Sequence, residues 1–106
     1  MTSYAIAHMR TVEMGPAIVE YLQRIDATLA PFEGGFVVHG ATPEVFEGEF
    51  PGHLIVIAFP TREQAEGWYD SPAYREILPL RLEHSTGAAF LVDGVEADHR
   101  ATDVLA

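Results

Sequence analysis

The chain has 106 residues, the usual size of one domain, and its six basic and sixteen acidic residues give it a net charge of −10. Such a surface repels phosphate backbones and anionic lipids, so we expect neither nucleic acid nor a membrane as a partner. The absence of cysteine excludes disulfides, thiolate metal sites and a cysteine nucleophile, and it favours a cytoplasmic location.

The first part of the chain predicts a strand, a helix and a second strand. Residues Tyr4 to Met9 are typical of a strand, and Pro16 suits the first turn of a helix. Gly34 and Gly35 are expected to end this helix, before a strand over Phe36 to Ala41. Apolar residues recur between these limits at spacings of 4, 3, 4 and 3, which predicts one buried helix face: Ile18, Leu22, Ile25, Leu29 and Phe32.

The middle of the chain predicts a loop, a third strand and a second helix. Residues 42–52 contain prolines and glutamates and are expected to form a loop or an irregular hairpin end. Leu54 to Phe59 is a continuous apolar run typical of a strand. Thr61 is expected to cap the helix that follows, with Gln64 completing a capping box.

The last part of the chain predicts one more helical segment and a fourth strand. Ser71 caps the segment, and Pro79 is expected to kink or end it. Ala88 to Val92 is the fourth strand. We therefore expect one domain over residues 1–94 and a tail over residues 95–106 that is loose or packed on a partner subunit.

This order of elements, βαββαβ, predicts a ferredoxin-like α+β fold with a four-stranded antiparallel sheet and helices on one face. A sheet with one wet face should alternate apolar and polar residues, yet these strands do not. In the third strand Leu54, Val56 and Ala58 face one way, and Ile55, Ile57 and Phe59 face the other. The uncovered face must be buried, and a second copy of the chain is the simplest cover, so we expect a homodimer.

One stretch of the sequence resembles a known family. The segment EGEFPGHLIVIAFPTREQAEGWYDSPAYREILPLR, residues 47–81, and within it FPTREQAEGWYDSPAY, resembles a bacterial family of small proteins of unknown function in the dimeric α+β barrel superfamily. Gly34, Gly35 and Gly40 fit the same pattern, and the resemblance covers about residues 3–94. It implies two ferredoxin-like sheets packed face to face across a dimer axis, with the helices outside.

Members of that superfamily include cofactor-free monooxygenases, lactone isomerases, haem enzymes and sensors, which hold a ligand between the sheet and its helices or loops. This range of activities means that the fold selects no chemistry. The family pattern often has arginine before Gly40, where this chain has His39. A role that requires a permanent positive charge is therefore weakened at this position.

Six residues are candidates for a site, two of them catalytic. His39 could act as a general acid or base, or it could be a hydrogen-bonded core or interface histidine. Trp68, Tyr69 and Tyr74 could line a small-molecule pocket or fill the core. Trp68 and Tyr69 point about 100° apart on a helix, so we expect Tyr69 to line the pocket, as the second catalytic candidate, and Trp68 to pack in the core.

The other two candidates are charged. Arg81 could bind a substrate carboxylate with two hydrogen bonds, or it could form a structural ion pair with Glu47 or another carboxylate. Glu47, in the loop, could act as a base or contact a substrate, or it could be an ordinary surface glutamate. We expect the pocket to lie between the sheet and the second helical region, bounded by the other five candidates.

The sequence predicts no metal and no cofactor. No pair among the five histidines has a short ligand spacing, and there is no glycine-rich phosphate loop. Three functions remain open: a cofactor-independent enzyme that uses acid/base chemistry on a small, partly apolar metabolite, a non-catalytic binding or sensing dimer, and a structural or interaction domain. An open pocket with His39 and one tyrosine would argue against the last.

Overall fold

The computed structural model describes residues 1–105, and the order of its strands and helices is β1 α1 β2 β3 α2 α3 β4. The strands are β1 (Ser3–Val12), β2 (Gly35–Ala41), β3 (His53–Phe59) and β4 (Ser85–Asp93). The helices are α1 (Pro16–Leu29), α2 (Arg62–Asp70) and α3 (Pro72–Leu82), with short 3-10 turns η1 (Ala30–Phe32) and η2 (Ala101–Leu105). Each predicted element is present, and most extend by one to three residues beyond the predicted ends.

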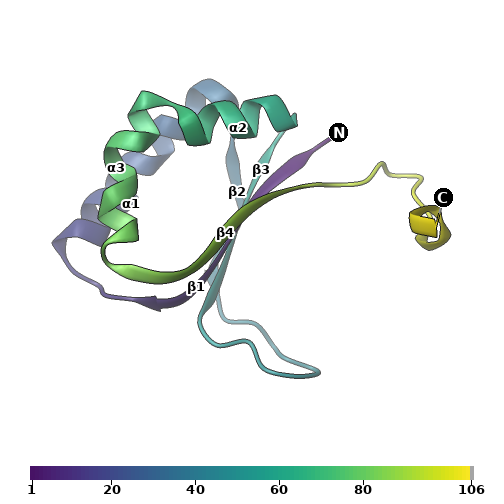
Figure 1. Cartoon of the computed structure of the whole chain (residues 1–106), viewed down its shortest axis with the longest axis horizontal. Coiled ribbons are helices and arrows are strands. Elements are labelled where there is room, and N and C mark those ends of the chain that lie inside the picture. The colour runs from purple at the N-terminus through teal and green to yellow at the C-terminus, as the bar shows by residue number, and fades with distance from the viewer. Residues whose placement is uncertain (106) are drawn as a thin grey trace.

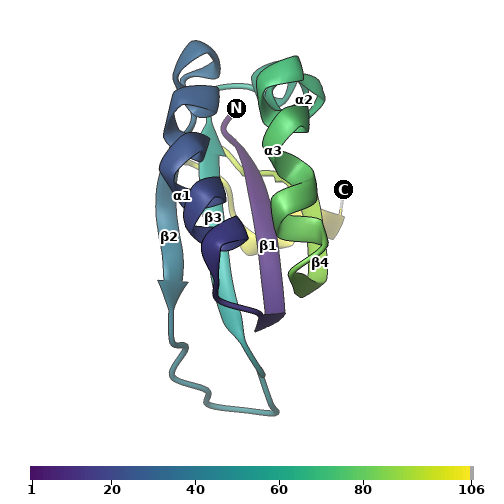
Figure 2. The same cartoon turned by 90° about the vertical axis from the view of Figure 1, so that its left-hand side faces the viewer.

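The four strands form one antiparallel sheet in the order β2-β3-β1-β4. The helices cover one face of this sheet, as Figures 1 and 2 show, so the predicted ferredoxin-like arrangement is confirmed. The chain after β4 leaves the body on the side away from the helices (Figure 1). This segment is the predicted tail, whose last residue, Ala106, lies outside the described residues. Within residues 1–105, no helix combines the length and the apolar character needed to cross a bilayer.

The buried face of α1 differs in one position from the predicted stripe. Ile18, Ile25 and Leu29 are buried as expected, but Leu22 is 42% exposed and Tyr21 is buried in its place. A helix has 3.6 residues per turn, so position 21 lies on the same face as positions 18 and 25 just as position 22 does. The exchange matters because the Tyr21 hydroxyl then reaches the interior.

The two glycines after α1 do not act as the sequence suggested. Glu33, and not a glycine, adopts the left-handed conformation that ends η1, with φ of 58°. Gly34 is needed for close packing instead, because a Cβ atom there would lie 2.6 Å from the Phe59 ring. At this end, α1 and the sheet are therefore in close contact.

The two helix caps are present as predicted. The Thr61 hydroxyl accepts a hydrogen bond from the Gln64 backbone N–H at 3.2 Å, and the Ser71 hydroxyl accepts one from the Tyr74 N–H at 3.2 Å. The capping box is altered, since the Gln64 side chain accepts from the Thr61 hydroxyl at 3.0 Å while its amide donates to Glu33 at 2.8 Å.

Pro79 does not end its helix, because α3 continues to Leu82. The alternative, a kink at Pro79, stays a prediction. Proline removes one N–H donor and crowds the carbonyl four residues before it, but the Pro79 carbonyl still accepts from the Glu83 N–H at 3.0 Å. Leu78 is buried and Leu80 packs against the core, so tertiary contacts hold the helix on both sides of the proline.

The sheet face away from the helices is apolar and uncovered in the single chain. Cross-strand neighbours form a row from β3 through β1 to β4, in which Ile6 pairs with Val56 on one side and with Phe90 on the other. Phe90 is 51% exposed and Val92, on the same face, is 43% exposed. We call this surface, defined by Ile6, Val56, Phe90 and Val92, the open face.

Candidate binding cavity

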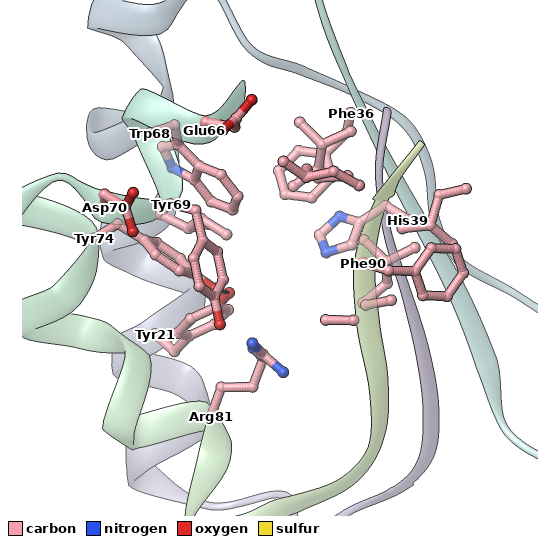
Figure 3. A pocket seen from close by; sticks show the side chains of 18 of the residues that line it. Tyr21, Phe36, His39, Glu66, Trp68, Tyr69, Asp70, Tyr74, Arg81 and Phe90 are labelled. Carbon is pink, nitrogen blue, oxygen red and sulfur yellow. Dashed lines mark hydrogen bonds between the residues drawn. The ribbon is translucent and has the colours of Figure 1, made fainter. Parts of the chain in front are cut away.

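A cavity of about 280 Å³ lies between the helices and the helix-facing side of the sheet. Figure 3 shows side chains from both layers pointing into it. Five of the six candidate residues line it, namely His39, Trp68, Tyr69, Tyr74 and Arg81. The predicted location, between the sheet and the second helical region, therefore holds a cavity in the structure.

An irregularity in β2 brings His39 onto the cavity side. Phe36 pairs with Ile57 and His39 pairs with Ile55, with an extra residue between them in β2. Residues three apart in a regular strand would face opposite sides, so the bulge puts both rings on the helix-facing side. The His39 ring stacks on Phe36 with 4.2 Å between ring centroids. No hydrogen bond to the exposed His39 ring forms within residues 1–105.

Helix α3 positions Tyr74 and Arg81 together. They are seven residues apart, close to two helical turns, so both side chains lie on the face toward the cavity. Across from them, α1 presents Tyr21, whose hydroxyl lies 2.7 Å from the Tyr74 hydroxyl. The two tyrosines are buried, and the Arg81 guanidinium points toward their hydroxyls (Figure 3).

The surroundings shift the pKa values of Tyr21 and Arg81. Burial, with the neighbouring Tyr74 adding to it, raises the pKa of Tyr21 far above its ordinary value near 10. Burial lowers the pKa of Arg81, but Tyr74 and Tyr21 together raise it by more, so it lies above its ordinary value. At neutral pH the site therefore contains a protonated Tyr21 hydroxyl beside a charged Arg81.

Of the two alternatives for Arg81, the structure contains no ion pair with Glu47 or another carboxylate within residues 1–105. Within residues 1–105, carboxylates form ion pairs with Arg24, Arg62 and Arg75, but none forms an ion pair with Arg81. Glu47 lies exposed in the loop between β2 and β3 and does not line the cavity. A contact between Glu47 and a ligand in this cavity is therefore not supported in the single chain.

Trp68 and Tyr69 both line the cavity, although we expected only one of them to do so. Trp68 is buried and donates from its indole N–H to the Thr28 hydroxyl at 3.0 Å, which fixes its ring as an inner wall. Tyr69 is half-buried, with its ring centroid 5.5 Å from that of Tyr74. The indole is wide enough to reach the cavity from a core position, so both side chains line it although they point in different directions from α2.

Tyr21 and Phe36 are among the lining residues that the sequence analysis did not propose. Tyr21 is next to Leu22 of the predicted apolar stripe, and this position on the helix could have indicated that Tyr21 is buried. Phe36 gave no signal, because only the bulge in β2 brings it to the same side as His39. Within residues 1–105 no three His, Asp or Glu side chains are grouped so that they could hold a metal ion.

The chain belongs to the family described as a domain of unknown function (DUF1330), whose model matches residues 2–95. Its fold is similar to that of a protein of unknown function from Rhodopseudomonas palustris, with a TM-score of 0.66 and 14% identity, covering 90% of this chain and 83% of that one. No curated protein matches the chain.

Two further solved structures have the same fold. A dimeric ferredoxin-like protein of unknown function from Jannaschia sp. has a TM-score of 0.66 and 13% identity, covering 91% of this chain and 100% of that one. SnoaB from Streptomyces nogalater, described as a cofactor-independent oxygenase and solved as a mutant, has a TM-score of 0.61 and 17% identity, covering 93% and 98%. At these identities the similarity shows the fold alone.

Proposed function

We propose that the protein is a homodimer that binds a small, partly apolar molecule in the cavity between its sheet and helices. The observation that carries the proposal is the cavity itself, which brings His39, Tyr69, Tyr74 and Arg81 to one space. Its volume of about 280 Å³ is just below the usual range for ligand pockets, roughly 300–1,000 Å³. The ligand is accordingly a small metabolite.

The open face supports the homodimer. It presents a continuous apolar surface on a sheet whose other face is covered by helices, and the structurally similar protein from Jannaschia sp. is described as dimeric. We expect an obligate sheet-to-sheet contact of more than ~1,200 Å² in total. Residues 95–105 of the tail leave the body beyond β4 on the side away from the helices (Figure 1), and there the tail could pack on the partner.

His39 and Tyr69 are the proposed catalytic groups. His39 has both ring nitrogens free of hydrogen bonds within residues 1–105, and Tyr69 presents a phenol to the same cavity. Together they supply one imidazole and one phenol hydroxyl, which suits proton transfer without a cofactor. SnoaB, with the same fold, is described as a cofactor-independent oxygenase, and this supports the type of chemistry but not the reaction.

The two other functions make different demands on these residues. A structural or interaction domain would have its charged side chains paired in contacts, but His39 and Arg81 face a cavity and neither forms an ion pair within residues 1–105. A non-catalytic binding or sensing dimer would use the same cavity and differ only in turnover. A cytoplasmic location, favoured by the absence of cysteine, remains part of the proposal.

A fragment screen tests the proposal, and the protein provides its own probe. Trp68 is the only tryptophan and lines the cavity, so its fluorescence reports binding there. We expect small aromatic fragments to change this fluorescence and Tyr69→Ala to alter the response. His39→Asn should leave binding in place and abolish any turnover detected. If no fragment perturbs Trp68, the cavity is not a binding site.

A further inference from the structure

We infer that the ligand of this cavity is a carboxylate with a flat apolar body, its carboxylate held by Arg81 beside the tyrosine pair. The inference rests on the proposed binding function and specifies the class of molecule bound. Two independent observations point to it: an excess of hydrogen-bond donors at one end of the cavity, and aromatic walls along the rest.

The donor excess follows from counting the groups around Arg81. A guanidinium has five N–H donors and no acceptor, and a phenol hydroxyl has one donor proton. One of the two phenol protons is used in the 2.7 Å contact between the Tyr21 and Tyr74 hydroxyls, which leaves the other free. The only acceptors in the group are the two phenolic oxygens. A carboxylate, which only accepts, would complete this arrangement, and its two oxygens match the guanidinium fork.

Among the charged side chains that line the cavity, Arg81 is the cation available to a ligand. Glu66 and Asp70 also line the cavity, but Glu66 pairs with Arg62 at 3.1 Å and Asp70 pairs with Arg75 at 2.9 Å. Arg81 forms no ion pair within residues 1–105 and is half-buried. A charge partly removed from water is stabilised by a counter-ion, and here the ligand would provide it.

The remaining walls are suited to a flat apolar body. Figure 3 shows the rings of Trp68 and Tyr69 on the helix side and those of Phe36 and His39 on the sheet side, with Arg81 at one end of the space between them. Aromatic rings on both sides favour stacking with a planar group. A ligand with its carboxylate on Arg81 therefore has its apolar body between these rings, next to His39.

The test uses two matched probe pairs, benzoate with benzamide and cinnamate with cinnamamide, and reads binding from Trp68 fluorescence and from calorimetry on the whole protein. The members of each pair have nearly the same shape and differ in charge. We expect the carboxylates to bind at least roughly tenfold more tightly than the amides, because a charged hydrogen-bonded pair replaces neutral ones. Arg81→Gln should remove this preference, and Arg81→Lys should restore part of it.

The control is Arg10→Gln, which removes one positive charge from an exposed position in β1 that does not line the cavity. It should leave carboxylate binding unchanged. An equal loss in Arg10→Gln and Arg81→Gln would show that general charge attraction is responsible and would overturn the inference. If each amide binds as tightly as its acid, the cavity binds small molecules but the carboxylate assignment is wrong. If no probe binds, both the inference and the proposed function fail.

Discussion

The hydroxyl oxygens of Tyr21 and Tyr74 lie 2.7 Å apart, although the two residues are separated by 53 positions in the chain. The contact joins α1 to α3 in the buried interior and also forms one end of the cavity. The same pair therefore contributes to holding the two helices together and to the polar surface that a ligand would meet.

We predict that this contact is measurable as a coupling energy. Tyr21→Phe and Tyr74→Phe should each lower the free energy of unfolding by about 1 kcal/mol, because each leaves a buried hydroxyl without its partner. The double variant should lose about 1 kcal/mol less free energy of unfolding than the two single variants lose together, because it leaves no unpaired hydroxyl. Urea unfolding of the four proteins gives this cycle, and strictly additive losses would contradict it.

The raised pKa of Tyr21 predicts a loss of stability at alkaline pH. Its pKa is raised by burial first and by Tyr74 second, whereas in the unfolded chain it is expected near 10. The folded protein therefore binds more protons above pH ~10, and the free energy of unfolding falls as pH rises through that value. Below that pH the contribution is fully present.

An absorbance titration of the tyrosines checks the alkaline prediction. The chain contains four tyrosines and no lysine, so few other side chains change charge in this range. In wild type, tyrosine ionisation should be incomplete until the protein unfolds, and Tyr21→Phe should remove part of the late-ionising signal. Complete ionisation in a protein that is still folded would show that Tyr21 is not shielded as the structure indicates.

The architecture could be predicted from the sequence because it depends on repeated patterns. The helix stripe from Ile18 to Leu29, the caps at Thr61 and Ser71 and the apolar strands each carry local signals, and they agree with one another. Features that depend on a single contact were not predictable. The left-handed residue after η1 is Glu33, and Gly34 is required by the nearby Phe59 ring, which no local pattern reveals.

The candidate site was predictable in its residue types but not in its geometry. Arg81 and Tyr74 could be placed on one helix face from their spacing alone. Tyr21, which meets them, lies on another helix and 53 positions before Tyr74. The alternative of an ion pair for Arg81 is not formed, because no carboxylate reaches it among residues 1–105. Long-range packing, and not local pattern, decides which of the expected partners meet.

Two adjacent glycines provide a direct test of the packing between α1 and the sheet. In Gly34→Ala the new methyl group would lie 2.6 Å from the Phe59 ring and 2.9 Å from Leu29, whereas at Gly35 no atom lies within 4 Å. We expect Gly34→Ala to lower the free energy of unfolding by about 1–3 kcal/mol, the usual cost of overpacking. Gly35→Ala should be close to neutral. Equal effects in thermal or urea unfolding would contradict the close approach.

The cap of α2 predicts a smaller effect. Thr61→Ala removes the hydroxyl that accepts from the Gln64 N–H, and it should lower the free energy of unfolding by about 1 kcal/mol. Thr42→Ala is the control, because Thr42 is exposed in the loop between β2 and β3. A melting temperature that is unchanged in Thr61→Ala relative to Thr42→Ala would count against the cap.

The proposed dimer can be tested with two valines of equal exposure. Val92 on the open face is 43% exposed and Val19 on the outer side of α1 is 44% exposed, so a charge introduced at either should cost the isolated chain a similar amount. In a sheet-to-sheet dimer, Val92→Glu buries one uncompensated carboxylate per subunit, in a chain whose net charge is already −10. We expect it to raise the dimer dissociation constant by at least about a hundredfold, while Val19→Glu leaves the constant unchanged. Sedimentation at micromolar concentrations, with circular dichroism to confirm folding, distinguishes these results. If wild type sediments as a stable monomer, or if both variants remain equally dimeric, the open face is not the interface and another cover for its apolar row must exist.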